Sequence, residues 1–208
     1  MIQQFSHVAS KILITGRSGS GKTTLFLRIL AASKASKRFI FDGEGELSHK
    51  TGIGRCFNTH QLKTALLGRD ILFDPSRMYP GDTAAAWRFF CEWAFEASRR
   101  LPGTKLLAVD ELQKITDSHD NPWEWSLVLE TGRRAGLDVL AIAQQANLIH
   151  NRVRTQMTEV STFGQSDKNA IAWLADIGFD AQSVRDLRPG KFIARNLLTM
   201  EEELGQVF

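Results

Sequence analysis

The chain has 208 residues, of which 43% are hydrophobic and 24% charged, a composition typical of one folded domain and not of a disordered chain. No apolar run approaches the roughly 18 residues of a membrane span, and residues 1–6 lack the layout of a signal peptide, so we expect a soluble protein. The net charge of +3 favours a weak attraction to polyanions, and the two distant cysteines, Cys56 and Cys91, are expected to be free buried thiols.

A phosphate-binding loop (P-loop, Walker A) is predicted at residues 16–23. It follows the apolar run 12–14, precedes a helical segment at 24–30, and matches the GxxxxGK[ST] spacing. Its glycines let backbone N–H groups converge on phosphate oxygens, while Lys22 can reach the β- and γ-phosphates and the Thr23 hydroxyl can ligate Mg²⁺. The expected nucleotide-binding residues are Gly16, Ser18, Gly19, Ser20, Gly21, Lys22, Thr23 and, near the α-phosphate, Thr24.

A second apolar segment, residues 38–42, reads as a buried strand that ends in Asp42. Two readings of this acid stay open at this stage. Asp42, Glu44 or Glu46 can polarise water or sense the γ-phosphate, or Asp42 can simply form a turn beside Gly43. Further strands at 53–57 and 70–74 and a short helix at 60–67 follow, an alternation that predicts a parallel sheet covered on both faces.

Residues 82–100 have the periodicity of an amphipathic helix that Asp82 can cap. The aromatic stripe along this helix is wide for one face, so we expect core packing to use most of it and leave open a subunit contact for the rest. The stripe comprises Trp87, Phe89, Phe90, Trp93 and Phe95.

An apolar strand at 105–109 delivers two acids, Asp110 and Glu111. Beside a P-loop this is the pattern of a Walker B segment, in which Asp110 holds Mg²⁺ and Glu111 acts as base on the water that attacks the γ-phosphate. A helix at 123–134 and a strand at 137–143 come next, and Gln144 follows that strand. Ligands of open parallel sheets bind at the carboxyl ends of strands, so Gln144 is a candidate contact to the γ-phosphate or its attacking water.

The remainder of the chain predicts a strand at 160–163, a helix at 168–177 and a final turn and strand at 187–195. The whole chain, 1–208, is expected to be one domain with a core at about 8–196. Residues 197–208 are expected to form a tail or a short helix of undisclosed role.

The order of these segments resembles the FtsK–HerA superfamily of P-loop motors. The resemblance rests on the P-loop, on 41–44, on 107–111, and above all on the Gly-Arg-x-x-Gly run at 132–136 that leads into a strand ending in Gln144. It covers roughly residues 11–195. It implies a three-layer, RecA-like α/β fold of the additional-strand class, ATP and Mg²⁺ as cofactors, and a homo-oligomer, expected as a hexameric ring.

The resemblance also implies two residue roles. Gln144 matches a sensor glutamine, and Arg133 matches an arginine that reaches into a neighbouring subunit's nucleotide site, where it would stabilise charge on the transferring phosphoryl group. Arg134 is a rival for that role, and both arginines can instead be helix C-terminal charges favoured by the dipole.

Cellular members of this superfamily carry membrane, accessory or DNA-reading domains that this sequence lacks. The bare motor resembles the genome-packaging ATPases of tailless, internal-membrane viruses and phages. That resemblance implies translocation of double-stranded DNA without sequence preference, a location in the host cytoplasm or the virion, and a capsid or membrane vertex protein as a further partner. The candidate DNA contacts are Lys114, Arg152 and Arg154.

Two other functions are compatible with the same motifs. A nucleotide-dependent assembly switch would use Lys22 and Asp110 without translocating DNA, whereas a motor also needs Arg133 and DNA-stimulated turnover. A small-molecule kinase is disfavoured, because no arginine-clustered lid segment follows a substrate-binding helix.

Overall fold

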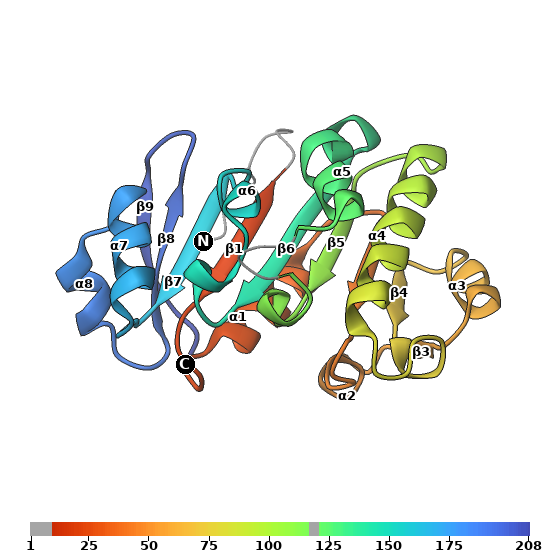
Figure 1. Cartoon of the computed structure of the whole chain (residues 1–208), viewed down its shortest axis with the longest axis horizontal. Helices are drawn as coiled ribbons and strands as arrows, with labels where there is room; N and C mark the ends of the chain where they lie inside the picture. Colours follow the sequence, from red (N-terminus) through yellow and green to blue (C-terminus); the bar gives the residue numbers. More distant parts are fainter. Residues whose placement is uncertain (1–9, 117–120) are drawn as a thin grey trace.

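The computed structural model describes residues 10–116 and 121–208. Within these ranges a single sheet of nine strands runs in the order β3-β4-β2-β5-β6-β1-β7-β8-β9 (Figure 1). The strands are β1 (Lys11–Thr15), β2 (Lys37–Phe41), β3 (Arg55–Cys56), β4 (Asp70–Phe73), β5 (Lys105–Val109), β6 (Leu137–Ala143), β7 (Glu159–Phe163), β8 (Lys191–Asn196) and β9 (Glu202–Gln206).

Every pair from β3 to β7 is parallel, and β8 and β9 extend the sheet as an antiparallel hairpin. The helices are α1 (Lys22–Ala32), α2 (Leu47–Thr51), α3 (Thr59–Ala65), α4 (Thr83–Arg100), α5 (Trp123–Thr131), α6 (Asn151–Arg154), α7 (Lys168–Asp176) and α8 (Ala181–Asp186), with 3₁₀ turns η1 (Pro75–Arg77), η2 (Leu112–Lys114), η3 (Gly132–Ala135) and η4 (Ala146–Leu148). The predicted α/β fold with a mainly parallel sheet is confirmed.

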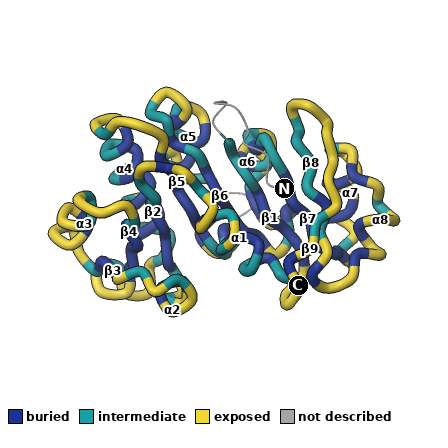
Figure 2. Tube along the Cα trace, turned by 180° about the vertical axis from the view of Figure 1, so that it is seen from behind, coloured by how far each residue is buried: buried dark blue, intermediate teal, exposed yellow. Residues whose placement is uncertain are grey.

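The sheet from β4 to β7 is buried on both faces, and alternate strand residues point to opposite sides, whereas β9 at the edge is mostly exposed. Leu13 and Phe39 pack with Trp87 of α4 on one face, whereas Ile14 and Ile40 pack with α1 on the other. Figure 2 shows the result as a row of buried strands between helices whose outer sides are exposed. The apolar strands of the sequence therefore form the middle of three layers.

The aromatic stripe of α4 lies in the core. Trp87 and Phe90 are fully buried, and Phe89 and Trp93 pack against the same cluster. Cys91 and Cys56 are free and buried, as expected. None of the helices in the two described ranges is long and apolar enough to cross a membrane.

Two expectations from the sequence are wrong. The helix predicted at 123–134 ends at Thr131, and η3 carries the chain on as a 3₁₀ turn to Gly136, whose left-handed φ of 64° stops it. The tail predicted at 197–208 contains β9, which pairs with β8 from Arg195↔Glu202 to Lys191↔Gln206. Gly205 permits this pairing, because a Cβ there would lie 2.2 Å from the Phe192 ring.

Candidate nucleotide-binding site

The P-loop connects β1 to α1 and is anchored on both strands that flank β1. Gly16 N donates to the carbonyl of Gln144 after β6 at 3.2 Å, and Arg17 N donates to the carbonyl of Gly164 after β7 at 3.3 Å. A Cβ on Gly16 would lie 2.6 Å from Phe163 Cβ, and Gly21, the N-cap of α1, has a left-handed φ of 113°. These two glycines are therefore required by close packing and by backbone conformation.

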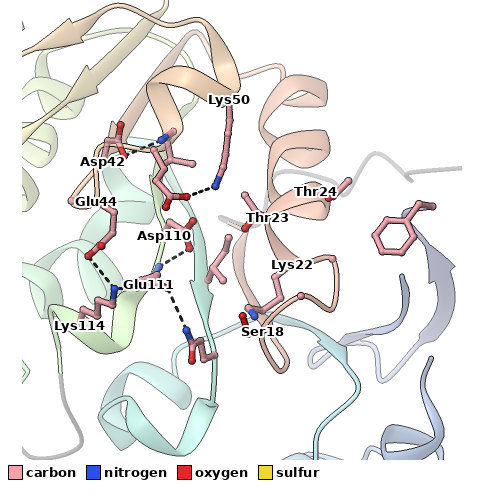
Figure 3. A pocket seen from close by; sticks show the side chains of 18 residues that line it. Ser18, Lys22, Thr23, Thr24, Asp42, Glu44, Lys50, Asp110, Glu111 and Lys114 are labelled. Atoms are coloured by element: carbon pink, nitrogen blue, oxygen red, sulfur yellow. Dashed lines mark hydrogen bonds and ion pairs between the residues drawn. The ribbon is translucent and has the colours of Figure 1, made fainter. Parts of the chain in front are cut away.

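A cleft of about 390 Å³ opens between the P-loop and the carboxyl ends of β2, β5 and β6 (Figure 3). From the P-loop it is lined by Ser18, Gly19, Gly21, Lys22, Thr23 and Thr24. Its other walls are Asp42, Gly43, Glu44, Glu46, Leu47, Lys50, Asp110, Glu111, Lys114, Ile142, Gln144 and Phe208.

Two of the predicted nucleotide-binding residues, Gly16 and Ser20, do not line the cleft. Gly16 is buried against Phe163, and Ser20 is buried with its carbonyl accepting from Gly190 N at 2.9 Å. Both residues therefore hold the loop in place through its contacts with Phe163 and Gly190.

Lys22 lies inside the cleft and is tied to its own loop. Its Nζ donates to the Arg17 carbonyl at 3.0 Å. Burial lowers the pKa of this ammonium, and the charges of Asp110 and Glu111 act in the opposite direction. A phosphate group would replace the Arg17 carbonyl as the acceptor of this hydrogen bond. Its negative charge would stabilise the charged form of the buried ammonium.

Asp110 stands across the cleft from Thr23 (Figure 3). Its Oδ1 accepts from Glu111 N at 2.7 Å, and none of the described residues donates to Oδ2. Burial raises the pKa of this carboxyl, an effect that a bound cation would reverse. A hydroxyl and a carboxylate are hard oxygen donors of the kind that Mg²⁺ prefers, so Thr23 and Asp110 fit the metal that the fold implies.

Glu111 adopts a left-handed backbone, with φ of 52° and ψ of 47°. A residue with a Cβ enters this conformation at a cost of roughly 1–2 kcal/mol, and such residues cluster at functional sites. Gln144 Nε2 lies 3.4 Å from Glu111 Oε1. The other carboxylate oxygen forms an ion pair with Lys114, whose Nζ also lies 3.1 Å from Glu44 Oε1.

Asp42 accepts hydrogen bonds from the start of α2, a structural role that the sequence analysis did not name. Its oxygens accept from Leu47 N at 3.0 Å and from Ser48 N at 3.1 Å, so the side chain satisfies the first amides of α2. Asp42, Glu44 and Glu46 all line the cleft, and Glu44 and Glu46 pair with Lys114 and Lys50, respectively.

Arg133 and Arg134 lie far from this cleft. Both are exposed in η3, just before β6 begins, whereas Gln144 follows the other end of the same strand. The seven residues of β6 span roughly 20 Å, so neither arginine can reach the nucleotide site of its own subunit. A role in a neighbour's site stays a prediction.

The candidate DNA contacts have partners within the described chain. Lys114 bridges the two acids described above, Arg152 Nε donates to Glu130 Oε1 at 2.6 Å, and the Arg154 guanidinium lies 5.8 Å from the Trp173 ring centroid. Arg152 is exposed and Arg154 is half-buried. Their role toward DNA is not tested by these contacts.

Two cleft residues were missed by the sequence reasoning. Lys50 lies on α2, a single helical turn without a strong periodic signal, and Phe208 comes from a segment expected to be a tail. No local pattern connects either residue to the P-loop, since only the packing of the sheet brings them there.

Comparison with known proteins supports the same fold. No protein-family model matches the chain, and no curated protein is similar to it in sequence. The genome-packaging NTPase B204 of Sulfolobus turreted icosahedral virus 2, solved with AMPPCP, is similar in structure, with a TM-score of 0.75 and 18% identity over 95% of this chain and 97% of that one.

Conjugation proteins are similar at lower scores. The pCW3 coupling protein TcpA, solved with ATPγS, has a TM-score of 0.58 and 14% identity over 98% of this chain and 63% of its own. The bacterial conjugative coupling protein TrwB has a TM-score of 0.67 and 11% identity over 94% and 84%. The chain thus shares the fold of these solved proteins, and its own sequence carries the GxxxxGK[ST] phosphate-binding loop.

Proposed function

We propose that this protein is an ATP-hydrolysing motor that moves double-stranded DNA and packages a viral genome. The observation that carries the proposal is the facing of Lys22 and Thr23 against Asp110 and Glu111 across one cleft. The similarity to a viral packaging NTPase over nearly the full length of both chains supports the choice of motor.

We propose a part in hydrolysis for each of these cleft residues. Lys22 and the first amides of α1 bind the β- and γ-phosphates, because both supply positive charge at the loop. Thr23 and Asp110 would hold Mg²⁺, which when bound neutralises charge on those phosphates. Glu111 accepts a proton from the attacking water. The water oxygen bonds to the γ-phosphorus while the bond from that phosphorus to the β-phosphate oxygen breaks, giving ADP and phosphate.

Gln144 is suited to position the attacking water, since its amide already lies at the Glu111 carboxylate. Arg133 would complete the site of an adjacent subunit in a homo-oligomeric ring, expected as a hexamer. That arrangement ties hydrolysis to assembly, because the arginine is too far from its own cleft to act there.

The DNA contact is proposed to be with the phosphate backbone. A motor must bind any sequence it moves along, so contacts to bases would hinder it, and backbone contacts release counterions. Binding of double-stranded DNA is therefore expected to weaken steeply with salt and to show little sequence preference. A capsid or membrane vertex protein is the further partner that a packaging role requires.

The test is ATP turnover per protomer, measured against protein concentration with and without double-stranded DNA. A ring motor requires a rate that rises with concentration and with DNA, and Lys22→Ala should abolish it. If ATP binds but turnover is indifferent to DNA and to concentration, the protein is a nucleotide-dependent assembly switch instead. Absence of ATP binding in the wild-type protein would refute both functions.

A further inference from the structure

The last residues of the chain pack directly on the P-loop. Gly190 connects the two, since its N–H donates to the Ser20 carbonyl at 2.9 Å and its own carbonyl accepts from Val207 N at 2.8 Å. Arg28 of α1 holds the same segment, donating to the carbonyl of Val207 at 2.6 Å and that of Gln206 at 3.3 Å. The segment that follows β9 is therefore held by backbone bonds through Gly190 to the loop and by side-chain bonds from Arg28 of α1.

The packing is close enough to involve the loop backbone itself. A Cβ on Gly21 would lie 2.7 Å from Val207 Cγ2 and 3.4 Å from the Phe208 ring. Val207 is buried at 2% exposure, whereas Phe208 remains 66% exposed and lines the cleft. The structure thus presents an aromatic ring, open to solvent, beside Gly21, the N-cap of α1.

Strand order places this ring on the side of the P-loop away from the acids. The P-loop follows β1, while Asp110 follows β5, two strands along the sheet in one direction. Phe208 follows β9, three strands along in the other direction. A nucleotide whose γ-phosphate faces Asp110 and Glu111 across the loop must extend its ribose and base the opposite way, toward Phe208.

We propose that Phe208 is the platform on which the nucleobase stacks. This inference rests on the proposed nucleotide-binding function and adds to it the group that holds the base. An aromatic ring and a planar base attract through their faces, and the exposed ring gains the apolar cover that it lacks in the free protein.

The chemistry of the platform determines what it selects. Stacking is tolerant of base identity because every base has a π-face, so Phe208 strengthens the binding of nucleotides in general without choosing adenine over guanine. It contributes nothing to the triphosphate, which Lys22 and the α1 amides bind. Truncation of the ring should therefore weaken the binding of the base and leave the binding of the triphosphate unchanged.

Calorimetric titration of the 208-residue chain with AMPPCP and with inorganic tripolyphosphate tests this separation. Phe208→Ala should raise the Kd for AMPPCP by roughly 5- to 150-fold, the range that the loss of one base stack implies, and leave the Kd for tripolyphosphate unchanged. Phe208→Trp should retain AMPPCP binding. Leu204→Ala is the matched control, because Leu204 is equally exposed at 66% on β9 but does not line the cleft.

Each other outcome overturns the proposal. An unchanged Kd for AMPPCP in Phe208→Ala would show that the ring does not contact the base, while the proposed function would stand. Equal weakening of both ligands would make Phe208 a support of the P-loop and not a base platform. If the wild-type protein binds neither ligand, the proposed function itself fails. A comparison of the thermal unfolding midpoints establishes that each variant is folded.

Discussion

Gln144 Nε2 lies 3.4 Å from Glu111 Oε1, although 33 residues separate the two in sequence. They meet because β5 and β6 are neighbouring parallel strands, with Val109 paired to Ala141, so the residues that follow both strands emerge at one edge of the sheet. The carboxylate assigned as the base is thereby held between an amide on one side and the Lys114 ammonium on the other.

Glu111→Gln should abolish hydrolysis while nucleotide binding is retained. The substitution removes the proton acceptor but keeps the shape of the side chain, and it leaves Lys22, Thr23 and Asp110 in place. The measurement is AMPPCP affinity by calorimetry beside steady-state ATP turnover, with Lys22→Ala as the variant that should lose both. Turnover near the wild-type rate in Glu111→Gln would remove Glu111 from its assigned role.

Lys114→Ala should raise the turnover measured without DNA, by up to about fivefold. In the free protein the Lys114 ammonium forms an ion pair with the Glu111 carboxylate. Loss of a partly exposed ion pair of about 1 kcal/mol corresponds to about a fivefold change in rate. Lys63→Ala, an exposed lysine on α3, is the control for the loss of one positive charge. A lower rate in Lys114→Ala would instead mean that the ammonium assists the reaction.

Arg133→Ala should fold and bind nucleotide yet hydrolyse it about 10³-fold more slowly, because the lost contact belongs to the transition state. A mixture with Lys22→Ala makes the test specific to a neighbour's site. Each variant lacks what the other keeps, so mixed rings should recover activity that neither shows alone.

The control for the Arg133 experiment is Arg134→Ala, which changes the adjacent exposed arginine of η3. Absence of recovery despite demonstrated co-assembly would restrict Arg133 to a local role at its turn. Recovery with Arg134→Ala in place of Arg133→Ala would transfer the assignment to Arg134.

Glu159 should make stability depend on pH. Burial, and then the charge of Glu203, raise its pKa from 4.5 to about 7, so the folded state favours the protonated form. Its contribution to the free energy of unfolding is therefore present below about pH 4.5, is lost as pH rises through 7, and is constant above. Glu159→Gln should be more stable than wild type at pH 8, by at most about 3 kcal/mol.

This advantage of Glu159→Gln should shrink when denaturant unfolding is repeated at pH 5.5. Glu92→Gln serves as the control for the loss of one carboxylate, since Glu92 is exposed on α4. A stability difference between wild type and Glu159→Gln that is the same at both pH values would contradict the raised pKa.

The parts of the site that lie on contiguous segments were predictable from the sequence. The P-loop and the Asp110-Glu111 pair combine a fixed spacing with an adjacent apolar strand, and the strand supplies the structural context that the spacing needs. The contact of Asp42 with α2 was not predictable, because it depends on where the amides of Leu47 and Ser48 point, and the sequence offered only an acid at the nucleotide or a turn beside Gly43.

The remaining features depended on contacts between distant segments. Hydrophobic periodicity assigned β6 and the body of α4 correctly. In contrast, β9 contains two acids and a glycine and has no apolar alternation, so its pairing with β8 is a tertiary effect. The cleft position of Phe208 follows from that pairing. A residue whose place is set by the last strand of a sheet has no local signal to reveal it.

The bridge through Gly190 makes the loop and the end of the chain thermodynamically coupled. Its amide and carbonyl join Ser20 to Val207, so a ligand that orders the P-loop also stabilises the docked segment. By reciprocity, a change that loosens the segment lowers the affinity of the P-loop for its ligand. Amide hydrogen exchange would report this coupling at a backbone position. Exchange of the Val207 N–H should slow when AMPPCP is added and quicken in Arg28→Ala, which removes the two hydrogen bonds that hold the segment to α1.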